Sequence, residues 1–260
     1  MKRSAPLAIA TISYLAFLTT VAYTVGFIGN VGVPKPIDSA PSLPFATALA
    51  VDMALIAVFA LQHSGMARRG FKQWLTRHVP HGAERGVYVL ASSLALAILM
   101  WQWQPLGGVI WTLVNHRAYV LVLGLYVASW CFLLYSTFLI DHLDLFGLRQ
   151  AWYFREGRQY SEPAFATPSL YRVVRHPIYL GWMGVVWITP VMTATHFVLA
   201  VATTLYIIAG VQLEERDLEA RLPEYRQYRA KVPALIPSLR RYLRSRRGTG
   251  GALTGDSSGR

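Results

Sequence analysis

The sequence predicts an all-α fold, a polytopic integral membrane bundle of five to six transmembrane helices with its N and C termini in the cytoplasm. Three observations lead to this prediction. Of 260 residues, 54% are hydrophobic and only 15% are charged, whereas soluble domains carry about 25% charged residues. The hydrophobic residues form blocks long enough to cross a bilayer, which takes about 20 residues as a helix. The basic residues gather between alternate blocks, as they do in oriented membrane proteins.

The hydrophobic blocks give the predicted spans in order. Four blocks correspond to one span each: residues 7–28, 43–61, 87–103 and 118–140. The last block, 178–212, is too long for one span. Pro190 lies near its middle and is followed by Thr193, Thr195 and His196, which predicts two spans joined by a tight hairpin. The alternative is a single span preceded by a re-entrant helix.

The charge distribution predicts the orientation. The formal net charge is +12, from 25 Lys and Arg against 13 Asp and Glu. Except for Lys35 and Arg117, the basic residues lie before the first block, after the second or fourth, or after the last. By the positive-inside rule, that side is cytoplasmic. The basic excess therefore reports topology, and we expect the lipid bilayer, not nucleic acid, to be a partner of the chain.

The chain is expected to form one membrane domain, residues 1–247, followed by a Gly/Ser/Thr-rich tail, 248–260, that is predicted to be disordered. The first block lacks a small-residue cleavage site, so we expect a retained span. Cys131 is the only cysteine, and its apolar surroundings predict a buried, inert thiol. Asp52 lies inside the second block, where an ionisable group is costly and is either paired, functional, or protonated and packed.

Polar residues gather at the predicted cytoplasmic ends of the spans. They are Gln62-His63-Ser64, Glu84-Arg85 with Tyr88, Asp141-His142 with Asp144, Arg175-His176-Pro177, and Glu214-Glu215. Helix ends of one bundle share a face, so we expect these groups to converge on one pocket. The alternative is that each caps a helix or meets lipid headgroups. The His residues lack metal-binding spacings and no CxxC pair exists, so no metal site is predicted.

The C-terminal third adds two features. Proline marks a first helical turn, so Pro177 predicts a helix start whose free N–H groups attract an anion such as a carboxylate. Tyr225 and Tyr228 share one face of a predicted helix, and aromatic faces attract sulfonium cations. The alternative for this last segment is an amphipathic helix on the membrane surface.

Taken together, these motifs resemble a known C-terminal signature. Its parts are Arg175-His176-Pro177-Ile178-Tyr179-Leu180-Gly181, Glu214-Glu215, Tyr225, Tyr228, and the Val-Pro-Ala-Leu-Ile-Pro run at 232–237. The set resembles that of the isoprenylcysteine carboxyl methyltransferase and phospholipid methyltransferase group, over about residues 171–237. These membrane enzymes use S-adenosylmethionine without a Rossmann domain.

Three further elements narrow the resemblance. They are Phe59-Ala60-Leu61-Gln62-His63-Ser64, Glu84-Arg85-x-x-Tyr88, and residues 144–150. They resemble the methanethiol S-methyltransferases, a branch beside the NnrU-like proteins that makes dimethyl sulfide, and the likeness then covers about residues 45–240. It implies a multi-pass enzyme of the cytoplasmic membrane whose active site faces the cytoplasm. The substrates would be a small thiol and S-adenosylmethionine, the product S-adenosylhomocysteine, and no obligate protein partner is implied.

The resemblance and the chemistry of thiolate attack on a sulfonium assign expected roles. The expected catalytic residues, which include a base for the thiol, are His142, Asp144, Asp141 and Tyr88. Which of the first three is the base stays open. The acceptor is expected to meet Gln62, His63, Ser64 and Phe146. The donor is expected to meet Arg149, Gln150, Arg175, His176, Pro177, Tyr179, Gly181, Glu214, Glu215, Tyr225 and Tyr228.

Three alternatives stay open at the level of sequence. The same donor site could serve another acceptor, such as a prenylcysteine carboxylate or a phospholipid amine. The chain could be a non-catalytic, NnrU-like accessory membrane protein. It could also be a sterol-reductase-like enzyme that uses NADPH.

Overall fold

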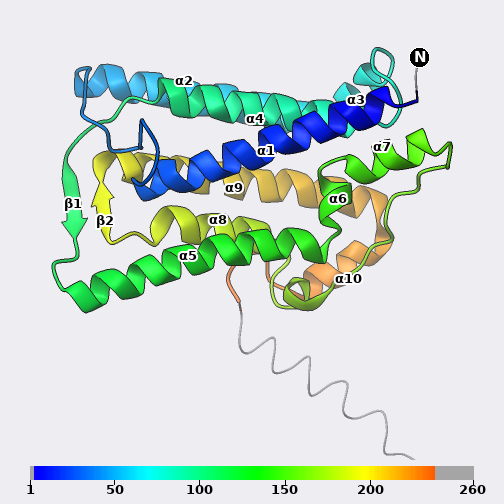
Figure 1. Ribbon diagram of the computed structural model, residues 1–260. Helices are drawn as coiled ribbons and strands as arrows, with labels where there is room; N and C mark the ends of the chain where they lie inside the picture. Colours follow the sequence, from blue (N-terminus) through cyan, green and yellow to red (C-terminus); the bar gives the residue numbers. More distant parts are fainter. Residues whose placement is uncertain (1–2, 238–260) are drawn as a thin grey trace, which may run out of the picture.

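A computed structural model describes residues 3–237, and the predicted disordered tail at 248–260 lies outside this range. The elements in chain order are α1 (Ala5–Gly29), α2 (Phe45–Ala67), α3 (Arg69–Leu75), α4 (Glu84–Gln102), β1 (Val109–Thr112), α5 (His116–Leu139), α6 (His142–Leu145), α7 (Leu148–Arg155), a 3-10 turn (Ser169–Arg172), α8 (Pro177–Trp187), β2 (Val191–Thr193), α9 (Ala194–Arg221) and α10 (Pro223–Lys231). The long helices run side by side (Figure 1).

Within the described residues, five helices are long and apolar enough to cross a membrane: α1, α2, α4, α5 and α9. This confirms the predicted polytopic α-helical bundle. The last hydrophobic block divides differently from the expected hairpin of two full spans. Its first part, α8, has 11 residues and is about 16 Å long at 1.5 Å per residue, roughly half of a bilayer core. The structure thus has five spans and one short helix packed among them.

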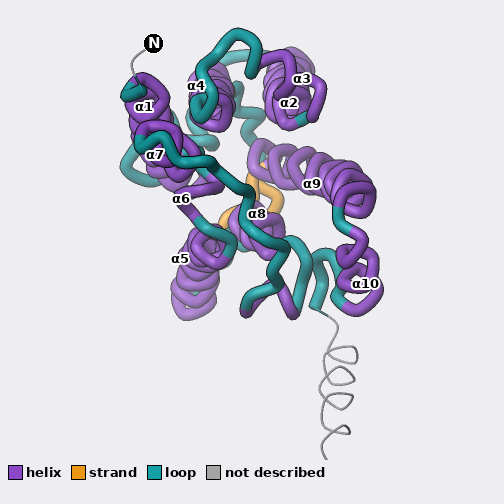
Figure 2. The backbone as a smooth tube through the Cα atoms, turned by 90° about the vertical axis from the view of Figure 1, so that its right-hand side faces the viewer, coloured by secondary structure: helices purple, strands orange, loops and turns teal. Residues whose placement is uncertain are grey.

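The bundle has two layers with distinct ends. Seen end-on, α1, α4 and α2 form one layer, and α5, α8 and α9 form the other (Figure 2). At one end β1 and β2 pair as a two-stranded antiparallel sheet, with Val109 opposite Thr193 and Thr112 opposite Val191. The short helices α3, α6, α7 and α10 lie at the other end (Figure 1), which we call the basic end because the predicted cytoplasmic Lys and Arg clusters follow the spans there. The sequence did not predict the sheet.

Two glycines allow α8 to pack closely against α5. A Cβ atom at Gly181 would lie 2.8 Å from Cβ of Leu133, and one at Gly184 would lie 2.6 Å from Oγ of Ser129. Helices in membranes rely on such small residues for close van der Waals contact. Gly181 was expected to contact the donor, and the structure places its open side against α5. The position of α8 inside the bundle therefore depends on these two residues.

Two residues within the spans, one apolar and one charged, show that hydropathy does not predict whether a side chain is buried. Cys131 was expected to be buried and is exposed, so that prediction is wrong. It lies on α5, whose outer surface carries exposed apolar side chains such as Val127 and Phe138, because the lipid-facing side of a membrane helix is as apolar as its packed side. Asp52 is fully buried, and its Oδ1 accepts a hydrogen bond from the backbone N–H of Gln104 at 2.8 Å. Asp52 therefore holds the segment that follows α4.

We expect Gly181→Val to destabilise the protein, because its side chain would overlap Leu133 and force α8 away from α5. Overpacking of this kind costs about 1–3 kcal/mol, which is measurable as a lower unfolding temperature in detergent. The matched control is Gly124→Val on α5, where a Cβ atom meets nothing within 4 Å. Equal unfolding temperatures for the two variants would contradict the close packing of α8.

Candidate functional site

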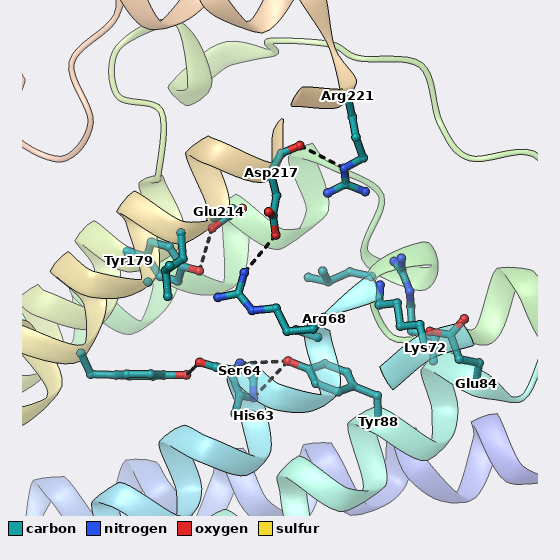
Figure 3. Close-up of a pocket in the computed structure, with 16 residues that line it drawn as sticks. His63, Ser64, Arg68, Lys72, Glu84, Tyr88, Tyr179, Glu214, Asp217 and Arg221 are labelled. Atoms are coloured by element: carbon teal, nitrogen blue, oxygen red, sulfur yellow. Dashed lines mark hydrogen bonds and ion pairs between the residues drawn. The ribbon is translucent and has the colours of Figure 1, made fainter. Parts of the chain in front are cut away.

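A cavity of about 380 Å³ lies toward the basic end, between α2 and α4 of one layer and α8 and α9 of the other. We call it the α2/α9 cavity (Figure 3). Its lining residues are His63, Ser64, Ala67, Arg68, Lys72, Glu84, Arg85, Tyr88, Leu145, Tyr179, Tyr206, Gly210, Leu213, Glu214, Asp217 and Arg221. The structure thus brings together five residues that were expected in the site, namely His63, Ser64, Tyr88, Tyr179 and Glu214, and also Glu84 and Arg85, which were expected to converge on the same pocket.

The lining of this cavity changes from uncharged to charged along its length. On α9 the contributing side chains recur every three or four residues, from Tyr206 through Gly210 and Glu214 to Arg221, which places them on one helix face. The residues nearer the middle of the bundle are uncharged. The acidic and basic lining residues all lie nearer the basic end, where Leu145, Tyr179 and Leu213 also line the cavity. The cavity therefore has an inner end, at His63 and Tyr206, and a charged outer end.

Hydroxyl groups surround the imidazole of His63 at the inner end. The Tyr88 hydroxyl lies 3.0 Å from Nε2 of His63, and the Ser92 hydroxyl lies 3.2 Å from Nδ1. Phe59, one helical turn earlier, stacks on the ring with centroids 5.3 Å apart. These contacts come from α2 and α4, and they fix the ring orientation at the cavity wall. His63 is thus a proton-accepting group held in place beside open volume.

Side chains of opposite charge face one another at the outer end. Arg68 Nη1 lies 3.0 Å from Asp217 Oδ2, which joins the end of α2 to α9. The Tyr179 hydroxyl donates to Glu214 Oε2 at 2.9 Å. Both contacts are visible in Figure 3. Lys72 from α3 lines the same region, so this end offers both cations and carboxylates to a ligand.

Glu215, the neighbour of Glu214, faces away from the cavity into a buried ionic cluster. Its Oε1 lies 2.6 Å from Nη2 of Arg175 and 3.0 Å from Nε2 of His176, and its Oε2 lies 3.1 Å from Nε of Arg229. The Tyr225 hydroxyl reaches the same carboxylate at 3.4 Å. The cluster ties the residues before α8 to α9 and α10. The carboxylate near the start of α8 is thus a protein side chain, and it is held by the side chains of Arg175 and His176 and not through the helix N–H groups that the sequence suggested.

The Val-Pro-Ala-Leu-Ile-Pro run completes this arrangement through its backbone. The N–H groups of Arg175 and His176 donate to the carbonyl oxygens of Pro233 and Ala234 at 2.9 and 3.1 Å. Tyr228 packs on Phe165 and bonds to the backbone of Tyr171. Burial raises the pKa of Tyr228 to about 12, which keeps it a neutral donor. The motifs of the C-terminal signature therefore contact one another directly.

The structure places His142 apart from the α2/α9 cavity. Its Nδ1 bonds to the Thr137 hydroxyl at 2.7 Å and its Nε2 to the Tyr14 hydroxyl at 2.9 Å. The ring stacks on Phe138 with centroids 4.2 Å apart, and it packs against Phe146. Burial lowers the pKa of His142, so the ring is neutral at pH 7. His142 and Phe146 thus belong to an aromatic cluster that packs α6 against α1 and α5.

The two aspartates beside His142 hold the turn after α5. Asp141 has a left-handed backbone conformation and caps α6 by accepting the N–H of Asp144 at 3.1 Å. Its carboxylate pairs with Arg149. Asp144 is buried and accepts the Tyr160 hydroxyl at 2.8 Å, while Arg85 Nη1 lies 3.5 Å from it. Asp144 reaches the cavity only through Arg85, which lines it.

A second cavity of about 330 Å³ lies beside the first and shares Lys72, Glu84 and Arg85 with it. Gln150 and Tyr160 line this second cavity. Gln150 was expected to contact the donor, and the structure places it here and not in the lining of the α2/α9 cavity. Gln62 lies next to His63 and donates to Ser92 at 3.4 Å. Pro177 is buried at the start of α8.

Several lining residues were missed by sequence reasoning. They are Ala67, Arg68, Lys72, Leu145, Tyr206, Gly210, Leu213, Asp217 and Arg221. A signal existed for those on α9, since Tyr206, Gly210, Glu214, Asp217 and Arg221 follow a helical repeat that includes an expected residue. No comparable pattern distinguishes Arg68 or Lys72 from the other basic residues after the second hydrophobic block.

We expect Glu215→Gln to destabilise the protein strongly, because it leaves Arg175, whose side chain is 8% exposed, without a carboxylate partner. Breaking a buried pair by removing one member costs about 3–5 kcal/mol. Glu214→Gln is the matched control, since the side chain of Glu214 is 45% exposed. Thermal unfolding in detergent compares the two, and equal losses of stability would contradict the division between a structural and a cavity-facing glutamate.

Comparison with other proteins gives the family. No family model matches the chain, and no solved structure matches it. A methanethiol S-methyltransferase of Crocosphaera subtropica is 49% identical over 225 residues, covering 86% of this chain and 88% of that protein. One of Mycobacterium tuberculosis is 45% identical over 91% of this chain and 98% of its own length. Nurim of Xenopus laevis is 30% identical over 66% of this chain and 63% of that protein.

The two methyltransferases align with nearly the whole bundle described above, including both layers around the α2/α9 cavity. Identity of 45–49% over such lengths confirms the resemblance that the motifs indicate. This chain belongs to the methanethiol S-methyltransferase family of integral membrane proteins.

Proposed function

We propose that this protein transfers a methyl group from S-adenosylmethionine to methanethiol, which yields dimethyl sulfide and S-adenosylhomocysteine. The relatives named methanethiol S-methyltransferase supply the reaction class and the acceptor. The observation that carries the proposal within this chain is the α2/α9 cavity, where a fixed imidazole lies at an uncharged inner end and ionic groups lie at the outer end. A small apolar acceptor needs an uncharged space beside the base, and a charged donor needs ionic groups, and this cavity offers both.

The donor fits the chemistry of the outer end. The cavity volume of about 380 Å³ lies within the range of about 300–1,000 Å³ that is usual for small-molecule sites. Arg68 and Lys72 suit the donor's carboxylate, and Glu214 and Asp217 suit its amino and ribose groups. The face of Tyr179 suits a sulfonium cation. We assign donor binding to these residues.

His63 would prepare the acceptor. A thiolate is the nucleophile in methyl transfer, and a simple thiol is mostly protonated at neutral pH. In our proposal a ring nitrogen of His63 takes the thiol proton, while Tyr88 and Ser92 hold the ring. The donor supplies an activated methyl group on a sulfonium sulfur. The thiolate electron pair forms the new S–CH₃ bond as the old C–S bond breaks, and its pair stays on the departing sulfur.

The expected base assignment changes with this geometry. His142 does not line the α2/α9 cavity but packs against Phe138 and Phe146, and Asp141 and Asp144 are occupied by Arg149 and Tyr160. These residues would support the cavity wall from behind. We also propose that the basic end faces the cytoplasm, because the basic residues gather there. Donor and product would then exchange with the cytoplasm.

The experiment that tests this function uses full-length protein purified in detergent. Incubation with S-adenosylmethionine and methanethiol should release dimethyl sulfide into the headspace, as measured by gas chromatography. Omission of either substrate, or heat inactivation, is the control. Donor binding by calorimetry without dimethyl sulfide formation would overturn the assignment of methanethiol and direct the search to larger thiols or lipids. Absence of donor binding would overturn the methyltransferase proposal.

We expect His63→Asn to lower kcat about 100- to 10,000-fold, the usual contribution of a general base, with little change in donor affinity. The deficit should shrink as the pH rises from 7 to 9, because the fraction of the thiol that is already ionised in solution, and therefore needs no base, grows with pH. His142→Gln is the matched control, since that ring lies outside the cavity lining, and its kcat should stay within a few-fold of wild type. A larger kcat loss in His142→Gln than in His63→Asn would contradict the assignment.

A further inference from the structure

Tyr206 lies at the inner limit of the α2/α9 cavity. Among the α9 residues that line the cavity, it is the one farthest from the basic end. It precedes Arg221 by fifteen residues, which is about 22 Å along the helix. Its hydrogen-bond partner in the lining, Ser64 of α2, is uncharged. This end therefore suits an apolar group and not the charged parts of a methyl donor.

A hydrogen bond across the two layers fixes the position of Tyr206. Its hydroxyl lies 2.8 Å from the Ser64 hydroxyl, and Ser64 directly follows His63 in the sequence. Tyr206 comes from α9 and Ser64 from α2, so the bond bridges the gap between these helices at the inner end. A tyrosine ring held in this way forms a firm boundary rather than a mobile one.

The space next to this boundary is open. Gly210 lies one helical turn beyond Tyr206 and lines the same cavity. A Cβ atom at Gly210 would meet no heavy atom within 4 Å. Ala67 of α2 also lines the cavity, so small side chains from both layers contribute to its wall, and Tyr206 is the α9 lining residue farthest from the basic end.

We propose that Tyr206, fixed by Ser64, determines acceptor size by closing the inner end of the cavity beside His63. This inference rests on the proposed thiol methylation and adds the residue that restricts the acceptor to short alkyl thiols. A thiol whose sulfur reaches His63 would place its alkyl group in the space bounded by Tyr206 and Gly210. A methyl group fits such a space, whereas each further methylene approaches the tyrosine ring.

The test compares kcat/KM for methanethiol and 1-butanethiol in detergent-purified protein. We expect wild type to favour methanethiol and Tyr206→Ala to shift the butanethiol-to-methanethiol ratio upward by at least 10-fold, since one methylene in an apolar pocket changes selectivity by about 10- to 200-fold. Tyr206→Phe keeps the ring and should stay closer to wild type than Tyr206→Ala. Leu205→Ala is the matched control, because Leu205 is 62% exposed and does not line the cavity.

A second variant tests the same boundary from the other side. Gly210→Val should occupy the open space and reduce kcat/KM for ethanethiol more than for methanethiol, with donor binding by calorimetry kept. This result can be read even if Tyr206→Ala fails to fold. An unchanged thiol ratio in both folded variants, or a wild type that uses methanethiol and butanethiol equally well, would overturn the role of Tyr206 and leave the proposed function intact. A wild type that methylates no thiol would overturn the proposed function itself.

Discussion

A carboxylate inside a membrane protein needs cationic partners, and Glu215 has them in Arg175 and Arg229, with Nε2 of His176 also within hydrogen-bond distance. Three segments that are distant in sequence meet at this one side chain: the entry to α8, the end of α9, and α10. The backbone bonds from residues 175–176 to 233–234 reinforce the same meeting point. The interior position of α8 therefore depends on an ionic contact at its start and on close glycine packing along its length.

The ionic contact of Glu215 also determines which glutamate faces the cavity. Adjacent residues of an α-helix point about 100° apart, so fixing Glu215 toward Arg175 turns Glu214 toward the cavity, where the Tyr179 hydroxyl meets it. Two consecutive glutamates thus carry different tasks. A buried salt bridge adds little net stability over a well-packed apolar core, which favours the view that this cluster is important for geometry.

The sequence was sufficient to predict which segments span the membrane. It was not sufficient to predict where each helix begins along the bundle or which face each helix turns inward. Hydropathy locates α1, α2, α4, α5 and α9, because lipid exposure demands long apolar stretches. It cannot show that α8 begins part-way along the bundle, since a half-span next to a full span is one continuous apolar block. It also cannot distinguish a lipid-facing Cys131 from a packed one, because both surroundings are apolar.

The same limit, that hydropathy does not report tertiary contacts, explains which site residues could not be placed from the sequence. The ends of the spans directed attention to His63, Tyr88, Tyr179 and Glu214, and the structure places these four in the lining of one cavity. The direction of a side chain at a helix end depends on tertiary contacts. His142 points into an aromatic cluster, and no local sequence pattern predicts this orientation.

The two layers meet at the cavity through few polar contacts, and these differ in strength between its two ends. Ser64 bonds to Tyr206 at the inner end, and Arg68 pairs with Asp217 at the outer end. Both pairs join α2 to α9, one through neutral hydroxyls and one through exposed charges. An ion pair near solvent is weak and screened by salt, whereas the hydroxyl pair lies deeper in the bundle. In the function we propose, the outer end would therefore be the side that admits the charged donor, while the inner end would keep its shape and set the space left for the acceptor.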